Sequence, residues 1–166
     1  MSRGFRLGAA GGGDVVKKNI LLFSNASGAE FPSWSPSNGI NNRLVISAYY
    51  GQTYGNETYT LTLNNVKAKN IKIDGSAYVV TARYNPSARF RLIVTFEDDS
   101  TATIVDKSSS SYGSTLDLTT FYDFQDTKKV KQVQVVKEVS NSTQTATTQH
   151  ETAITPTVTS IMLNVE

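Results

Sequence analysis

The feature that most restricts the fold of this chain is a short-period alternation of apolar and polar residues, which recurs along most of its length. It is clearest in residues 89–96, where Phe90, Leu92, Val94 and Phe96 occupy every second position. Because successive side chains of a β-strand point to opposite faces of the sheet, this period of two predicts a strand with one buried face. Similar strand segments are expected at residues 15–23, 43–50, 59–63, 71–73, 78–84, 101–106, 130–139 and 154–165, and residues 116–124 form either a strand or one helical turn.

Turn-forming residues separate these segments. Asn64-Asn65 and Asn85-Pro86 are typical of turns, and Asp74-Gly75 is a strong signal for a β-hairpin. A strand with one apolar face must pack that face against a second layer. About nine such strands, with no helix between them, therefore predict an all-β fold, an antiparallel two-sheet β-sandwich of the jelly-roll type, over residues 15–166.

The composition excludes several classes of protein. Of the 166 residues only 18% are charged, and Val, Ile, Thr, Ser and Asn are abundant. These residues favour strands and polar turns, which argues against a helical bundle, a coiled coil or a doubly wound α/β fold. The net charge of +2 does not indicate a nucleic-acid-binding face, and no apolar run approaches the roughly 18 residues of a membrane span. The absence of cysteine excludes disulfides and thiolate metal sites.

Residues 1–14 are rich in glycine and show no alternation of their own. Because glycine loses more conformational entropy on ordering than any other residue, we expect a flexible Gly-rich N-terminal arm. Such an arm orders only on a partner surface, and four side chains could anchor it there: Arg3, Phe5, Arg6 and Leu7. We expect it to dock on a neighbouring subunit, and the alternative is an inert tail.

Two parts of the sequence resemble known families. The run Arg-Phe-Arg-Leu-Ile-Val-Thr-Phe-Glu-Asp-Asp-Ser-Thr-Ala-Thr-Ile at residues 89–104, followed by Tyr122-Asp-Phe, Val133-Gln-Val-Val and Ile161-Met-Leu-Asn-Val, resembles the closing strands of jelly-roll carbohydrate-binding modules. The opening Gly4-Phe-Arg-Leu-Gly-Ala-Ala-Gly-Gly-Gly looks like the start of small tail and virion proteins of bacteriophages. Together the resemblances imply a virion component with a lectin-like sandwich, and they carry over no ligand-binding residue.

Aromatic residues in polar segments are the candidate binding residues. Tyrosine and tryptophan rings stack on the flat apolar faces of sugars, while neighbouring polar groups orient the sugar. The alternative is that these rings only cover loop edges of the sandwich, as we expect of Phe31 and Trp34 in the long loop at residues 24–42. The candidate glycan-binding residues lie in or beside segments rich in Gly, Ser and Asn: Trp34, Tyr49, Tyr50, Tyr54 and Tyr112.

Catalysis is not expected. The single histidine, His150, lies in a low-complexity segment at residues 140–153, where no rigid partner can orient it for a catalytic triad. Most carboxylates that a glycosidase could use lie beside turn signals, where they bond to the local backbone. The sequence therefore predicts no catalytic residue, no cofactor and no metal site. A structural calcium ion is a minor alternative, with ligands from Asp98, Asp99, Asp106 and Asp117.

Two arginines require a partner. If residues 78–84 and 89–96 form a hairpin with aligned apolar faces, Arg83 and Arg91 lie nearly opposite each other on the outer face. Like charges in this position are destabilising, so a carboxylate of this chain, an anionic ligand or a partner subunit should lie nearby. On the inner face, the predicted core consists of Leu61, Leu63, Val80, Phe90, Leu92, Val94, Phe96, Val133, Val135, Ile161 and Leu163.

These observations favour a non-enzymatic structural protein of the virion, associated with a phage tail or tail tip. Its expected partners are other virion proteins, further copies of itself and a host-surface glycan. The alternatives are a free carbohydrate-binding module, a capsid decoration or head-fibre protein, and a small glycan-active enzyme. The Gly-rich arm favours assembly over a free module, because a free lectin has no use for an arm that orders only on a partner.

Overall fold

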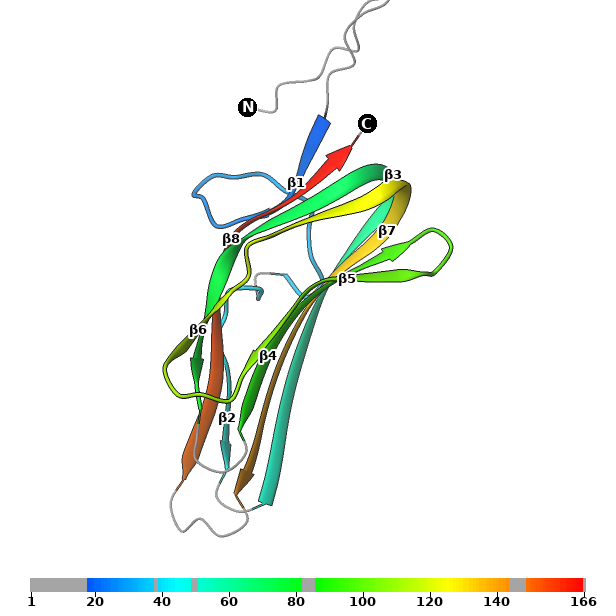
Figure 1. Ribbon diagram of the computed structural model, residues 1–166. Helices are drawn as coiled ribbons and strands as arrows, with labels where there is room; N and C mark the ends of the chain where they lie inside the picture. The colour runs from blue at the N-terminus through cyan, green and yellow to red at the C-terminus, as the bar shows by residue number, and fades with distance from the viewer. Residues whose placement is uncertain (1–17, 38, 49–50, 82–85, 144–148, 166) are drawn as a thin grey trace, which may run out of the picture.

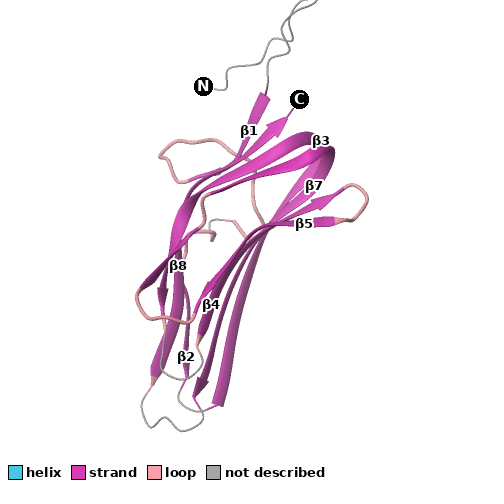
Figure 2. Cartoon of the chain, in the orientation of Figure 1, coloured by secondary structure: helices cyan, strands magenta, loops and turns pink. Residues whose placement is uncertain are grey.

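The computed structural model describes residues 18–37, 39–48, 51–81, 86–143 and 149–165, and the regular structure within them is β-strand throughout (Figure 2). No helix in this part of the chain has the length and apolar character needed to cross a membrane. All strand pairings are antiparallel. The strands are β1 (Lys18–Ser24), β2 (Leu44–Ala48), β3 (Gly51–Val80), β4 (Ser87–Phe96), β5 (Thr101–Ser109), β6 (Ser114–Asp117), β7 (Thr120–Thr143) and β8 (His150–Val165).

The strands form two layers that pack face to face (Figure 1). Layer one contains β5, β4, the second half of β7 and the first half of β3, in that order. Layer two contains the second half of β3, then β8, and then β1 and β2 one after the other along the far edge of β8. The other edge of β3 pairs with β6 and with the first residues of β7. The prediction of an all-β, antiparallel, jelly-roll-like sandwich is confirmed.

Two long strands run through both layers, which the sequence pattern did not predict. Because β3 has 30 residues and β7 has 24, their hydrogen bonds join the layers into one bent sheet. The register of β3 shifts between Thr62 and Val66 and again at Gly75. Asn65 and Gly75 have φ angles of 48° and 157°, which glycine and asparagine tolerate best. The expected turns at these positions are therefore β-bulges inside one strand.

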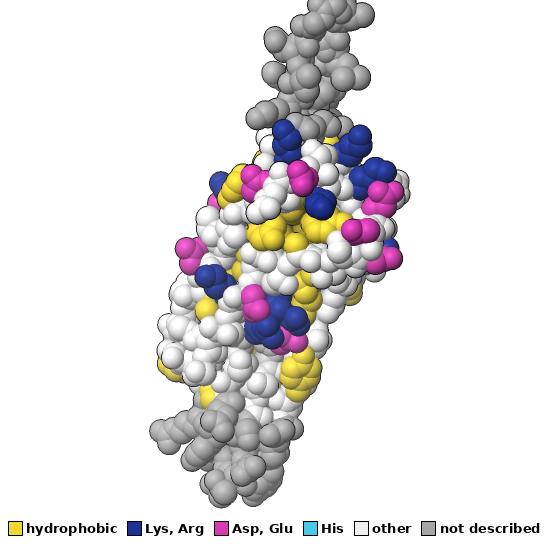
Figure 3. Space-filling view, turned by 45° about the vertical axis from the view of Figure 1, so that its right-hand side comes forward, with side chains coloured by type: hydrophobic (Ala, Val, Ile, Leu, Met, Phe, Trp, Pro, Cys, Tyr) yellow, Lys and Arg dark blue, Asp and Glu magenta, His cyan; other side chains and the backbone are white. Residues whose placement is uncertain are grey.

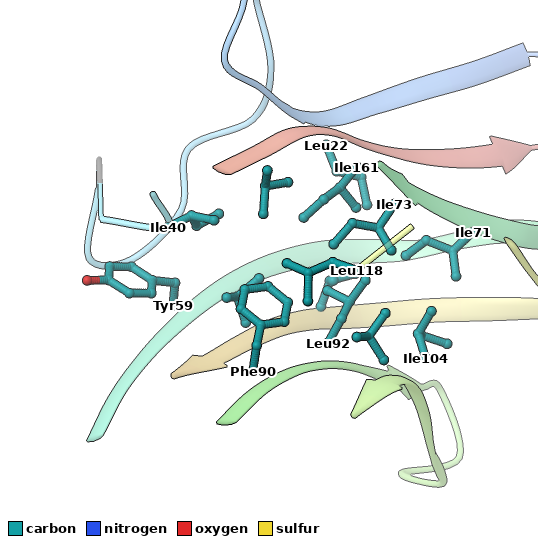
Figure 4. Packing of buried hydrophobic residues seen from close by; sticks show 14 of the residues in the cluster. Leu22, Ile40, Tyr59, Ile71, Ile73, Phe90, Leu92, Ile104, Leu118 and Ile161 are labelled. Carbon is teal, nitrogen blue, oxygen red and sulfur yellow. The ribbon is translucent and has the colours of Figure 1, made fainter. Parts of the chain in front are cut away.

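The inner faces of the two layers form one hydrophobic core. In β4 the alternation is strict, and Phe90, Leu92 and Val94 are fully buried. Figure 4 shows Phe90 and Leu92 facing Ile73 and Ile161 across the sandwich. Leu63 is half-buried against this core. The other predicted core residues, apart from Val80, are buried as expected: Leu61, Phe96, Val133, Val135, Ile161 and Leu163.

The prediction for Val80 was wrong by one residue of strand phase. Ala77 and Val79 are fully buried, whereas Val80 is half-buried and Tyr78 is exposed. Both faces of this segment carry apolar residues, so hydrophobicity alone does not decide its phase. The odd-numbered residues of β3 stay on the buried face from Ile73 through Gly75 to Val79. The expected turn at Gly75 treated the residues on its two sides as separate strands, so the phase of the second part was not tied to that of the first.

The expected hairpin between residues 78–84 and 89–96 is also wrong. The neighbours of β4 are β5 and β7, and β3 does not pair with β4. The second half of β3 belongs to layer two and β4 to layer one, so the chain changes layer between Thr81 and Pro86. Residues 1–14, the predicted arm, lie outside the described residues.

Candidate functional site

The first half of β3 presents an exposed aromatic ring on the outer face of layer one. Tyr54 is 60% exposed, yet its hydroxyl is held by two partners. It donates to Glu138 Oε1 at 2.8 Å and accepts from Asn56 Nδ2 at 3.1 Å. The register explains the contacts, because Asn56 lies directly opposite Glu138 and Tyr54 is two residues away on the same face. The hydrogen bond to Glu138 is the main cause of a raised pKa of the Tyr54 phenol.

Two arginines of β4 continue this surface, and both are paired with carboxylates. Arg91 donates from Nη2 to Glu138 Oε1 at 3.0 Å. Arg89 binds Asp106 through two nitrogens, at 2.7 and 2.6 Å, in the fork geometry typical of arginine. The hydrogen bond from Arg89 is the main cause of a lowered pKa of Asp106. We call the set Tyr54, Asn56, Arg89, Arg91, Asp106 and Glu138 the Tyr54 surface.

The Tyr54 surface is balanced in charge, with two guanidinium groups and two carboxylates. On the face that Figure 3 presents, basic and acidic side chains likewise lie beside one another rather than in separate regions of one sign. A shallow hollow of about 220 Å³ adjoins the tyrosine, lined by Tyr54, Ser87, Arg89, Glu138, Val139 and Ser140. A hollow of this size can hold part of a ligand, but it does not enclose the ligand.

Arg91 has two acidic neighbours within its own chain. Glu138 of the same chain lies beside it, and Asp106 is its directly opposed residue in β5. Arg83 lies outside the described residues. β3 is not the neighbour of β4, and the residues directly opposite Arg91 are Asp106 of β5 and Val136 of β7.

Trp34 is a core residue and not a free ring. It is 5% exposed, and its Nε1 donates to the carbonyl oxygen of Leu22 at 2.8 Å. In the same loop the rings of Phe31 and Phe23 lie 5.3 Å apart, so both loop aromatics fasten it to the sandwich as expected. A ring this buried cannot stack on a sugar, so Trp34 is removed from the glycan-binding candidates.

Tyr112 is exposed, but it belongs to a different part of the molecule. It is 76% exposed in the turn between β5 and β6. It lines a cavity of about 580 Å³ together with His150 and Glu151, none of which is part of the Tyr54 surface. His150 begins β8 and pairs with Ala48, so the histidine lies in a strand and not in the expected loop. Tyr49 and Tyr50 lie outside the described residues.

No protein-family model and no curated protein matches the chain. Among solved structures, that of the infectious bursal disease virus Gx strain aligns over 75% of this chain and 32% of its own, at 10% identity and a TM-score of 0.39. The VP2 subviral particle of the same virus aligns over 76% of this chain and 33% of its own, at 13% identity and the same TM-score. This chain thus spans about a third of the length of those proteins, and no residue role is transferred from them.

A buried lysine, missed by sequence reasoning, lies behind the Tyr54 surface. Lys137 is fully buried, and its Nζ donates to Gly39 O at 2.9 Å, to Asn42 O at 2.7 Å and to Glu57 Oε2 at 2.9 Å. The ammonium also lies 4.9 Å from the centre of the Tyr59 ring, within the range of a cation–π contact. Lys137 therefore clamps the loop between β1 and β2 onto layer one.

The ionisation of this cluster follows from its burial. Desolvation lowers the pKa of Lys137. Burial pushes the pKa of Glu57 upward, but hydrogen bonds from Lys137 and Tyr59 outweigh it and hold that pKa below its usual value. Burial and the bond from its hydroxyl to Glu57, 2.7 Å long, raise the pKa of Tyr59 to about 12. The one available signal in the sequence is the position of Lys137, in phase with Val133, Val135 and Val139.

The acidic residues considered as calcium ligands form hydrogen bonds in turns or ion pairs with basic side chains. Asp98 accepts from the backbone of Ser100, and Asp117 accepts from that of Thr119, as residues at turns do. Asp106 is bound to Arg89. Within the described residues, no group of three or more His, Cys, Asp or Glu side chains is arranged to hold a metal ion.

Proposed function

We propose that the protein is a non-enzymatic structural subunit of a virion, associated with a phage tail or tail tip, whose sandwich contacts host-surface glycans through the Tyr54 surface. One observation carries the glycan contact: Tyr54 is exposed, while hydrogen bonds to Glu138 and Asn56 hold its ring in place. A ring that is already ordered loses little entropy when a sugar stacks on it. The groups around it offer both donors and acceptors for sugar hydroxyls.

The charge balance of the surface supports binding rather than hydrolysis. A glycosidase needs one carboxyl group kept protonated by a raised pKa and a second carboxylate across the sugar. Here the pKa of Asp106 is lowered by Arg89, and Glu138 accepts hydrogen bonds from Arg91 and Tyr54. Asp106, with its pKa lowered in this way, is suited to accept hydrogen bonds and not to act as a general acid.

Jelly-roll sandwiches serve both as capsid domains and as lectins, so the fold is compatible with either half of the proposal. The virion half is supported by the Gly-rich residues 1–14, which favour assembly over a free module. A free carbohydrate-binding module is the second candidate, because the Tyr54 surface would serve it equally well. A decoration or head-fibre protein shares the assembly role and differs only in its place in the particle.

Replacing Tyr54 by alanine should weaken binding to host cells or to a glycan array by about tenfold or more, because the stacking surface is lost. Tyr54→Phe should retain part of the binding, since the ring stays while its hydrogen bonds to Glu138 and Asn56 go. Tyr78→Ala is the matched control, because it removes another exposed tyrosine, from layer two, that is not a glycan-binding candidate. Equal binding by Tyr54→Ala and the wild type would remove this surface from the proposal.

Deleting residues 1–14 should leave the melting temperature of the sandwich nearly unchanged and reduce the oligomers or particles that the full chain forms. The physical reason is that a glycine-rich arm costs about 1–2 kcal/mol per residue to order and gains contacts only on a partner. Light scattering coupled to size exclusion measures the assembly, and circular dichroism measures the melting. Normal assembly of the truncated chain would contradict the role of the arm, whereas a large loss of stability would place the arm on its own sandwich.

A further inference from the structure

The outer face of layer two carries a row of three apolar residues and one lysine that the core does not use. Leu21 of β1 lies opposite Met162 of β8, Met162 lies opposite Lys72 of β3, and Lys72 lies opposite Phe121 of β7. Directly opposed residues of a sheet point to the same face. Phe121 is 61% exposed. We call Leu21, Met162, Lys72 and Phe121 the outer-face row.

The rows on either side of it are polar. Phenylalanine and methionine are residue types enriched at protein interfaces, and an apolar group set within a polar surface marks a contact site. The outer-face row is therefore a small contact surface with a polar rim. One flanking row consists of Asn19, Asn164, Asn70 and Asp123, and the other of Ser24, Ser160 and Asp74.

The rim is acidic. Asp74 and Asp123 border the row, and Asp117 extends the same face through its pairing with Ser76. Lys72 is the basic member, and its Nζ lies 3.1 Å from Asp74. An occupant with apolar side chains and positive charge therefore matches the surface best.

Residues 1–14 of this protein have that chemistry. Phe5 and Leu7 are the apolar anchors, and Arg3 and Arg6 carry positive charge beside them. The chain enters β1 at Lys18, which pairs with Val165 at the end of the sheet and directly precedes Asn19 of a flanking row. The ten residues between Leu7 and Lys18 span up to about 33 Å when extended, which suffices to reach an adjacent copy.

We infer that the outer-face row is the docking site for residues 1–14 of a neighbouring copy. Phe5 and Leu7 rest against Phe121 and Met162, and the arginines pair with the acidic rim. This inference rests on the assembly role proposed for the arm and adds the surface that receives it.

The test combines light scattering with a designed crosslink in the full chain. Phe121→Ser should raise the protein concentration needed for half-assembly at least tenfold without changing the melting curve, because Phe121 lies outside the core. Tyr78→Ser is the matched control, since it removes another exposed aromatic from the outer side of layer two, and it should assemble like the wild type. If the chain lacking residues 1–14 fails to assemble while Phe121→Ser assembles normally, the outer-face row is not the docking site, and the assembly role proposed for residues 1–14 still stands.

The protein has no native cysteine, so a double variant with Gly8→Cys, next to the anchor Leu7, and Ser160→Cys, in the flanking row beside Met162, reports the docking directly while keeping Phe121 and Leu7 in place. Oxidation should produce covalent dimers and larger species on denaturing gels, and either single variant should produce none beyond random collision. A crosslink confined to the monomer would show that the arm folds back on its own chain and would overturn docking between copies. The absence of any crosslink at concentrations where the chain assembles would equally overturn it.

Discussion

Replacing Phe90 by alanine is expected to lower the free energy of unfolding by about 3–5 kcal/mol. Phe90 is fully buried in β4, in the middle of the layer-one inner face, and its ring faces residues of layer two (Figure 4). Alanine loses the transfer free energy of the ring and leaves a cavity that a close-packed sandwich fills only in part. The melting temperature, followed by circular dichroism, should fall by roughly 10 °C for a domain of this size.

Phe121→Ala is the matched control for this prediction. It removes the same side chain from an exposed strand position, where substitutions usually change stability by less than about 0.5 kcal/mol. Phe96→Ala, at a buried position on the same face of β4, should behave like Phe90→Ala. If both β4 variants melt at the wild-type temperature, Phe90 and Phe96 do not face the core and the assigned phase of β4 is wrong.

Replacing Lys137 by methionine should lower the free energy of unfolding by about 1–3 kcal/mol. The new side chain has a similar shape, so the loss is chiefly electrostatic. Without the ammonium, Glu57 loses its ion-pair partner and keeps the hydrogen bond from Tyr59, while the carbonyl oxygens of Gly39 and Asn42 each lose one donor. Urea unfolding of the variant and the wild type measures the difference.

The control for this effect is a second lysine of the same strand. Lys131 forms an ion pair with Asp99 at the surface, and such exposed pairs contribute about 0–1 kcal/mol. A second test adds Glu57→Gln to Lys137→Met, which removes the unpaired carboxylate and should recover part of the loss. If Lys137→Met is as stable as Lys131→Met, the contacts of Lys137 with Glu57 and with the loop between β1 and β2 do not stabilise the fold.

The inner residues of β4, β7 and β8 could be predicted from the sequence because their two faces differ clearly in polarity. Phe90, Leu92 and Val94 alternate with more polar or exposed positions, and only one phase of the strand buries them all. The segment 77–80 has apolar residues on both faces, so its phase depends on the strand into which it continues. That continuity through Gly75 is a property of the folded sheet.

The candidate binding aromatics share a similar sequence context but differ in their exposure to solvent in the folded protein. Trp34 and Tyr54 both lie near glycine, serine and asparagine. Trp34 reaches the carbonyl oxygen of Leu22 and is buried, whereas Tyr54 stands on an outer strand face beside Glu138. Glu138 is 84 residues from Tyr54 in the sequence, and no local pattern brings such residues together.

The sequence by itself determined the all-β class, the antiparallel sandwich and most of its core, because a period of two and the chemistry of turns act over a few residues. Only the tertiary structure decided whether Asn65 and Gly75 end a strand or bend it, because asparagine and glycine tolerate the positive φ angles found in turns and in bulges alike. It also decided the partners of Lys137 and Arg91. The free energy of a buried or paired charge depends on groups that long-range strand pairing brings within hydrogen-bonding distance.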